Sequence, residues 1–274
     1  MTTIAMPIMP VNRLMNGGTE SGAFTGRGDL TKGKSCNKHC YMIWENRTIK
    51  SPSVDRPAFT AAHASSYVEG TLRKVPGLAA LHRMTSMLVA ERAPVQARVL
   101  VLGAGGGMEL KALADDNSGW RFCGIDPSAD MLRVAEQTVG PHLPRVHLQQ
   151  GYIDDAPEGP FDAAVCLLTL HFVDRPHRLD TLEQIRRRLV PGAPFVVAHI
   201  SFPQSEPERS TWIARHVAFG GTASGDAESA RQAIATKLSV LSPEEDEAVL
   251  RKAGFSDVRL FYAAMTFRGW VGYA

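Results

Sequence analysis

The sequence predicts an α/β fold: a doubly wound, mostly parallel sheet of seven strands with helices on both faces. From residue 98 onward, short apolar runs rich in β-branched residues alternate with longer amphipathic segments, as in sheets built from strand–helix–strand units. The first apolar run, 98–102, leads directly into the glycine-rich stretch 103–107. Such a stretch is typical of a tight turn between a strand and a helix, where a ligand can approach the backbone closely.

The predicted elements follow in order along the chain. Two helices precede the sheet, over 56–74 and 78–92, because the Val-Pro-Gly stretch at 75–77 interrupts helical periodicity. The predicted strands are 98–102, 120–126, 145–149, 161–168, 195–200, 258–263 and 265–273, and the helices among them are 108–116, 129–139, 178–189 and 242–254. Right-handed crossovers place the carboxyl ends of the parallel strands along one edge of the sheet. The last two strands are expected to form an antiparallel hairpin.

Local patterns justify three of these elements further. The run 161–168 is almost wholly apolar, which is typical of a central strand buried on both faces. Ser242-Pro-Glu-Glu is a clear helix start, with a capping serine, a proline in the first turn and acids beside the positive end of the helix. The run Arg186-Arg-Arg188 lies at the end of an amphipathic helix and is expected to face solvent.

The chain divides into an N-terminal segment, 1–55, and one domain, 56–274. The segment is predicted to be disordered or loosely attached, because its middle part is glycine-rich and polar without helix or strand periodicity. Within the domain, 206–238 is a polar helical insertion after the fifth strand, and its position predicts a lid over the mouth of a binding site.

Composition excludes several classes of function. A net charge of +2 gives no electrostatic basis for nucleic-acid binding, and no apolar run is long enough to cross a bilayer. The beginning of the chain carries no apolar leader, so a cytoplasmic protein is expected. Cys123 and Cys166 are expected to be reduced core residues. Cys36, His39 and Cys40 lack a second half-site, so no metal is predicted, and translation starting at Met42 is an alternative reading of the N-terminal segment.

The spacing of the glycines indicates which cofactor the turn holds. The dinucleotide pattern Gly-x-Gly-x-x-Gly would need a glycine where Met108 stands. Gly103, Gly105 and Gly107 fit Gly-x-Gly-x-Gly instead, the pattern of class I S-adenosylmethionine (SAM) methyltransferases, which have a Rossmann-like sheet. The chain resembles that family, and the resemblance implies SAM as cofactor. A flexible turn without a ligand is the alternative for these residues alone.

Asp126 ends the second predicted strand about 20 residues after the turn, where doubly wound folds place an acid that binds ribose hydroxyls. The same residue also opens the next helix together with Pro127 and Ser128, which suit a helix start. Both roles can hold together. Met131, one turn into this helix, is either an adenine contact or a core residue.

From about residue 59 onward the chain is similar to one branch of this family, the synthase that makes carboxy-SAM from SAM and prephenate for tRNA wobble-uridine modification. The stretches that carry the resemblance are Arg73-Lys-Val-Pro-Gly77, the glycine turn, Gly124-Ile-Asp126, Leu168-Thr-Leu-His-Phe172, Leu189-Val-Pro-Gly192, Leu250-Arg-Lys-Ala-Gly-Phe255 and Phe267-Arg-Gly-Trp270. By position, the resemblance implies that the methionine part of SAM meets Gly103, Ala104 and Gly105, the ribose meets Asp126 and Pro127, and the adenine meets Tyr152 and Ile153.

The chain departs from this branch at several ligand positions. The branch has Asp at Tyr152, Asn at Leu167, Tyr at Leu78 and an acid at Val101, and its lid arginine falls at Gly220. A buried carboxylate without a cation costs several kcal/mol. Arg215 or Arg231 could replace the lid arginine only if the lid repacks. The departures therefore favour a relative that has lost the carboxy-SAM specialisation. Leu167 is still expected at the cofactor edge, because it lies at the end of the fourth predicted strand.

Three functions follow from these patterns. The first is methyl transfer from SAM to an unidentified acceptor, with a small-molecule substrate as partner and a homodimer as one possible assembly. The second is carboxy-SAM synthesis, and the third is a SAM-fold module that binds a partner without catalysis. His171, at the mouth of the fourth strand, is the candidate general base if the acceptor must lose a proton, and a hydrogen-bonded core histidine is its alternative reading.

Overall fold

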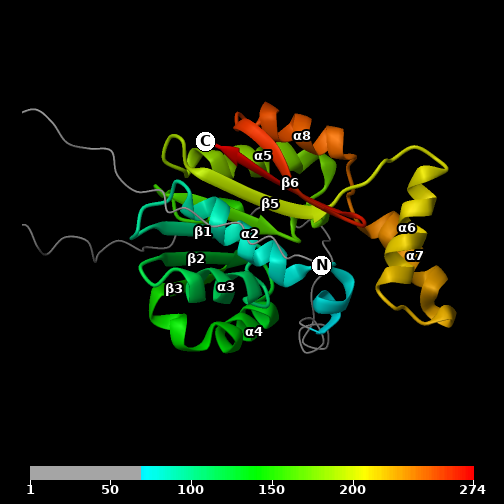
Figure 1. Ribbon diagram of the computed structural model, residues 1–274, viewed down its shortest axis with the longest axis horizontal. Coiled ribbons are helices and arrows are strands. Elements are labelled where there is room, and N and C mark those ends of the chain that lie inside the picture. The colour runs from blue at the N-terminus through cyan, green and yellow to red at the C-terminus, as the bar shows by residue number, and fades with distance from the viewer. Residues whose placement is uncertain (1–68) are drawn as a thin grey trace, which may run out of the picture. The chain divides into compact units, whose positions relative to one another are not determined.

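The computed structural model describes residues 69–274, and the N-terminal segment 1–55, with its Cys36, His39 and Cys40, lies outside the described residues. The described chain contains a seven-stranded sheet in the order β3-β2-β1-β4-β5-β7-β6, shown in Figure 1. The first five strands are parallel to one another, and β7 runs antiparallel to both β5 and β6. The predicted mostly parallel sheet with a closing antiparallel hairpin is therefore confirmed.

The strands lie close to their predicted places. Their bounds are β1 Arg98–Leu102, β2 Arg121–Asp126, β3 Val146–Gln150, β4 Ala163–Leu167, β5 Pro194–Ile200, β6 Ser256–Ala264 and β7 Phe267–Tyr273. β4 is buried along its whole length, as the apolar run 161–168 predicts for a central strand. The pairing of β1 with β2 and β4 puts Leu102 opposite Ile125 and Val101 opposite Val165, so the ends of these strands meet at one edge.

The helices alternate with the strands. Their bounds are α2 Leu78–Ala90, α3 Met108–Asp116, α4 Ala129–Val139, α5 Arg175–Arg187, α6 Glu208–Phe219, α7 Ala227–Lys237 and α8 Pro243–Lys252. Residues 69–74, the end of the first predicted helix, are also helical. Short 3-10 helices occupy Gly140–Arg145 (η1), Ile153–Asp155 (η2), Leu170–Phe172 (η3) and Ser224–Asp226 (η4). The start of α5 is three residues earlier than predicted, with a proline in its first turn.

Two apolar cores cover the two faces of the sheet. Side chains from α2, α3 and the lid pack with one set of strand residues, including Val99 and Val101. Side chains from α5 and α8 pack with the alternate set, including Leu100 and Leu102. Since successive strand residues point to opposite faces, this division is what a doubly wound sheet requires. Figure 1 shows α5 and α8 together on one side of β5.

The insertion 206–238 forms two helices, α6 and α7, which pack against each other to the right of the sheet in Figure 1. Gly221 separates them with a φ of +68°, a backbone conformation that favours glycine. Ile213 of α6 belongs to the apolar core beneath, so the insertion is anchored rather than free. The predicted helical character is confirmed, and the lid role remains a prediction.

One expectation about surface charge is wrong. Arg186 and Arg187 are exposed, but Arg188 is fully buried. Its guanidinium donates hydrogen bonds to the carbonyl oxygens of Pro157, at 3.1 Å, and Gln184, at 2.9 Å. The arginine follows the end of α5, and its charge is satisfied by carbonyl groups of a loop and of α5 rather than by water.

Candidate active site

The glycine turn between β1 and α3 is held by backbone contacts and by conformations that favour glycine. Gly103, Gly106 and Gly107 have φ values of +81°, +85° and +68°. The N–H groups of Gly103 and Ala104 both donate to the carbonyl of Ile125, at 2.8 and 3.0 Å. These bonds tie the turn to the end of β2, so the turn keeps its shape at the carboxyl edge of the sheet.

The turn also leaves no room for side chains where its neighbours approach. A methyl group added at Gly105 would lie 2.7 Å from Asp126 Oδ2, and one added at Gly107 would lie 2.8 Å from the Cα of Ala135 in α4. At Gly103 it would lie 1.9 Å from Oγ1 of Thr169. Each glycine of the Gly-x-Gly-x-Gly pattern therefore meets a different element, which explains why all three are needed.

Asp126 links the turn to the start of α4. Its Oδ2 accepts from the N–H of Gly105 at 3.0 Å, and its Oδ1 accepts from the N–H of Ser128 at 2.9 Å. Ser128, rather than Asp126, is the N-cap of α4, because its Oγ accepts from the Met131 N–H. Burial raises the pKa of Asp126, and the two backbone hydrogen bonds oppose that rise. Each carboxylate oxygen retains a further lone pair that could accept a ligand hydroxyl.

The remaining predicted cofactor residues differ in their surroundings. Met131, Ile153 and Leu167 have relative exposures of only 2, 5 and 4%, so their side chains are core contacts in this structure. Tyr152 is 39% exposed, and Pro127 is also exposed. The N–H of Gly151 donates to the carbonyl of Asp126 at 3.0 Å, which brings the loop that carries Tyr152 and Ile153 beside the end of β2.

Thr169 is a member of this edge that the sequence analysis did not single out. Its hydroxyl donates to the carbonyl of Leu167 at 2.8 Å, and its side chain lies against the backbone of Gly103. The preceding residue, Leu168, has a φ of +55°, which is rare for a branched side chain and marks a sharp bend at the end of β4. The bend directly after β4 thus places Thr169 against the glycine turn.

His171 follows in η3 and is almost completely buried, with 5% of its surface exposed. The N–H of Ile200 points to its Nδ1 at 3.4 Å. Burial lowers the pKa of His171 well below 6.5, and nearby His199, Arg178 and His216 lower it further. The imidazole is therefore neutral near pH 7, and with Nδ1 accepting, its proton resides on Nε2.

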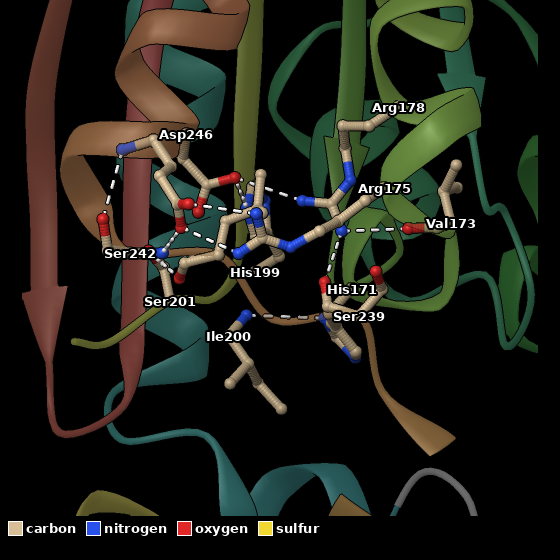
Figure 2. A network of polar contacts seen from close by, with 12 residues as sticks. His171, Val173, Arg175, Arg178, His199, Ile200, Ser201, Ser239, Ser242 and Asp246 are labelled. Carbon is tan, nitrogen blue, oxygen red and sulfur yellow. Dashed lines mark hydrogen bonds and ion pairs between the residues drawn. The ribbon is translucent and has the colours of Figure 1, made fainter. Parts of the chain in front are cut away.

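A buried ionic network lies beside His171, as Figure 2 shows. Arg178 of α5 donates through Nη1 to Asp246 Oδ1 of α8 at 3.1 Å. His199 of β5 places its Nε2 3.0 Å from the same carboxylate oxygen, although the alignment falls short of a hydrogen bond. All three side chains are 1% exposed. The network joins the sheet to two helices through a single carboxylate.

The same network holds the segment by which the chain returns from the lid. Arg178 Nη2 donates to the carbonyls of Val173 and Ser239, and the N–H of Ser239 donates to the carbonyl of His171 at 2.8 Å (Figure 2). Ser201, just after β5, donates its hydroxyl to the carbonyl of Leu241 at 3.2 Å. The root of the lid is therefore attached both to the His171 loop and to the end of β5.

On the lid itself, His216 of α6 contacts the turn between β6 and β7. Its Nδ1 lies 2.6 Å from Thr266 Oγ1, and burial lowers its pKa to about 4, with Lys74 acting in the same direction. Arg215 lies over the ring of Trp212, 4.7 Å from its centroid, and Arg231 pairs with Glu228 at 3.2 Å. The two lid arginines that sequence analysis considered for a substrate carboxylate thus have other partners.

Glu109 is a second residue that sequence analysis missed. It lies in the first turn of α3, directly after the glycine turn, and is 5% exposed. A glutamate next to a glycine turn looks in sequence like an ordinary acid at the positive end of a helix, so its burial gave no local signal.

Within residues 69–274, no group of three or more His, Cys, Asp or Glu side chains is arranged to hold a metal ion. Cys123 and Cys166 are buried free thiols, as predicted. None of the helices in this part of the chain combines the length and the apolar character that a bilayer span needs.

The part of the chain that forms this edge is similar to known methyltransferases. Residues 100–195, from β1 to β5, match the family model described as a methyltransferase domain. The chain is 24% identical over 154 residues to the carboxy-S-adenosyl-L-methionine synthase of Campylobacter lari, which covers 56% of this chain and 66% of that protein. It is 26% identical over 227 residues to the synthase of the same name from Pseudomonas syringae pv. tomato, covering 79 and 92%.

A solved structure has the same fold. It is a putative O-methyltransferase from Nostoc punctiforme, with a TM-score of 0.58 and 21% identity, and the match covers 78% of this chain and 59% of that one. The chain therefore spans less than two thirds of that structure and about two thirds of the first relative, at 66%.

Proposed function

Because this chain belongs to the class I SAM-dependent methyltransferases, we propose that it transfers the methyl group of SAM to a small-molecule acceptor. The observation that carries this proposal is the junction of the glycine turn with β2, where the Gly105 N–H meets Asp126 at 3.0 Å and any side chain at Gly105 would strike the carboxylate. Such a turn, made of glycines and one alanine, suits the close approach of an amino-acid tail, and the adjacent acid with further lone pairs suits the hydroxyl groups of a nucleoside.

The residues of the edge would divide the cofactor among them. Asp126 and Pro127 would hold the ribose, and Tyr152 and Ile153 would lie at the adenine, with Met131 packed behind. Gly103, Ala104, Gly105 and Gly107 would let the methionine part approach the backbone, and Leu167, at the end of β4, would lie at the same edge. Bound SAM supplies a methyl group already activated on a sulfonium, so the protein's task is chiefly to align the acceptor and exclude water.

For His171, the structure favours a role as a neutral hydrogen-bond donor over that of general base. Its Nδ1 faces the N–H of Ile200, so only Nε2–H is available to an acceptor molecule. Desolvation and the charge of Arg178 hold its pKa well below 6.5, which makes the ring a weak base. An acceptor that already carries a free lone pair needs no base at this position.

Binding of SAM and of its product S-adenosylhomocysteine tests this proposal directly by calorimetry. The Asp126→Ala variant should bind both about tenfold or more weakly, since it loses charge-assisted hydrogen bonds to the ribose. Asp180→Asn, an exposed acid on α5, serves as the control and should bind like the wild type. Absence of binding of either compound to the wild-type protein would refute the proposal.

The second candidate function is carboxy-SAM synthesis, which is favoured by the names of the relatives. The lid argues against it, because Arg215 lies over Trp212 and Arg231 pairs with Glu228. Neither guanidinium is placed to meet an additional substrate carboxylate unless the lid repacks. Incubation with SAM and prephenate, followed by mass spectrometry for the carboxylated product, decides between the two reactions.

A further inference from the structure

Glu109 is buried at a place where a negative charge has little support. It is 5% exposed, and its neighbours Leu110 and Leu113 on α3 belong to the apolar core. Burying a carboxylate without a compensating cation is costly, so acids at such positions are either paired or protonated.

No cationic side chain of the described residues forms an ion pair with Glu109. The pKa of Glu109 is raised to about 8, chiefly by burial and to a smaller extent by the nearby charge of Asp126, while a hydrogen bond from the residue's own backbone N–H opposes the rise. The acid is thus left with one weak local partner and a neighbour of the same charge.

Glu109 interacts electrostatically with groups on two strands of the sheet. The charge of Asp126, at the end of β2, acts on Glu109, and the charge of Glu109 acts on the thiol of Cys166 near the end of β4. β1 lies between β2 and β4 and contributes no acid of its own, since Val101 stands fully buried near its end. Glu109 is therefore an unpaired acid at the edge where the glycine turn emerges.

We propose that Glu109 accepts hydrogen bonds from the α-ammonium group of bound SAM. This inference rests on the proposed function. The ammonium supplies three N–H donors and a full positive charge. These are the partners that the carboxylate of Glu109 does not receive from the described residues. The α-carboxylate on the same carbon suits the positive end of α3. The sulfonium, which has no N–H, does not offer such hydrogen bonds.

The pairing makes cofactor binding depend on a proton. The ligand-free protein holds Glu109 mostly protonated at pH 6.5, because its pKa is about 8. The ammonium favours the carboxylate and lowers that pKa, so binding releases a proton. At this pH the α-amino group of the ligand stays charged, since such groups titrate at about 7.7–8.0.

Calorimetry of the full-length protein at pH 6.5, in two buffers of different ionisation enthalpy, measures this release. The wild type should release close to one proton per SAM bound. Glu109→Gln keeps the shape of the side chain but cannot ionise, so it should bind SAM roughly 10- to 100-fold more weakly and release no proton. The control, Glu136→Gln, alters an exposed acid on α4 and should behave like the wild type.

Three ligands separate the ammonium from the rest of the cofactor. S-adenosylhomocysteine keeps the ammonium but has no sulfonium, so Glu109→Gln should weaken it by the same factor as SAM. Methylthioadenosine lacks the amino-acid tail, so its affinity should not change. A loss confined to SAM would overturn the proposal in favour of the sulfonium, and an equal loss for all three ligands would reduce Glu109 to a structural residue.

The failure of this inference is distinguishable from the failure of the proposed function. If the wild type binds SAM and Glu109→Gln binds it equally well with the same proton release, only the role of Glu109 is refuted. If the wild type binds neither SAM nor S-adenosylhomocysteine, the cofactor assignment itself fails. A thermal melt of the ligand-free variant checks folding, and we expect its Tm to equal or exceed that of the wild type.

Discussion

Glu109 and Asp246 are the two acids with buried side chains among the described residues, and they differ in what surrounds them. Each lies in the first turn of a helix, Glu109 in α3 and Asp246 in α8. Asp246 has Arg178 at 3.1 Å and His199 at 3.0 Å. Glu109 has no ion pair within residues 69–274, and its pKa is affected by the charge of another acid, Asp126.

The contrast teaches how to separate structure from function at this edge. Both acids gain the same modest help from the positive end of a helix, typically 0.3–1 kcal/mol, which is too little to offset burial. Asp246 is compensated by its own chain and joins β5, α5 and α8. Glu109 is uncompensated beside a turn suited to a ligand, so a cationic ligand is the simplest source of its missing partner.

The largest effect is expected from removing the charge of Asp246, the acid that has an ion-pair partner. Asp246→Asn leaves the buried guanidinium of Arg178 without a counter-charge, which typically costs about 3–5 kcal/mol. Urea unfolding should therefore give a free energy of unfolding that is lower than that of the wild type by about this amount. The adjacent Glu245→Gln is a matched control, because its pair with Arg175 is exposed on both sides and is worth under about 1 kcal/mol. Equal stability of the two variants would refute the structural role of the network.

A smaller effect is expected in the pH dependence of stability when the wild type is compared with Glu109→Gln. Its pKa is about 8 in the folded protein against an ordinary value of 4.5, so the folded state holds this proton more tightly. Its contribution to stability is present below the unfolded pKa and is lost as pH rises through the folded one. Between about pH 5.5 and about pH 7.5, the wild type should lose roughly 2–3 kcal/mol relative to Glu109→Gln.

Unfolding of both proteins in urea at the two pH values isolates this contribution, since every other titrating group is shared. The difference between the two free energies of unfolding should change with pH in favour of the glutamine variant. Parallel pH profiles would show that Glu109 is ionised or paired in the free protein, and the comparison with Asp246 would then lose its basis.

The smallest expected effect concerns the turn itself. Gly105→Ala places a methyl group 2.7 Å from Asp126 Oδ2 and 3.0 Å from the Cβ of Met131, so overpacking should destabilise the fold by about 1–3 kcal/mol and weaken SAM binding. Gly225→Ala, in the lid, meets nothing within 4 Å and should leave stability and binding near those of the wild type. Unchanged SAM affinity in Gly105→Ala would place the cofactor away from this turn.

Sequence patterns predicted the fold because the information is local. Alternating apolar runs set the order of strands and helices, and glycine, proline and serine at their ends marked turns and caps such as Ser242. The glycine turn and Asp126 were recognisable for the same reason, since both belong to one strand–turn–helix–strand unit. The binding role of these residues stays a prediction until SAM binding is measured.

Other members of the edge could not be predicted from sequence. Thr169 meets Gly103 only because β4 lies beside β1, and the bend at Leu168 has no distinctive signature. Arg188 looked like part of an exposed basic run, and its burial depends on the loop carbonyls of residues 156 and 157. His199 has no distinctive sequence signature, and its contact with Asp246 depends on how α8 returns to the sheet.

By itself, the sequence determined the order of elements and the position of the glycine turn, because hydrophobic periodicity and backbone preference act over a few residues. The tertiary structure alone decided which charges are buried and which of them have partners. Asp246 and Glu109 both lie in the first turn of a helix, yet one meets an arginine 68 positions away in the sequence and the other has no such partner among the described residues. Electrostatic compensation depends on distance in space, and only the packed fold sets that distance.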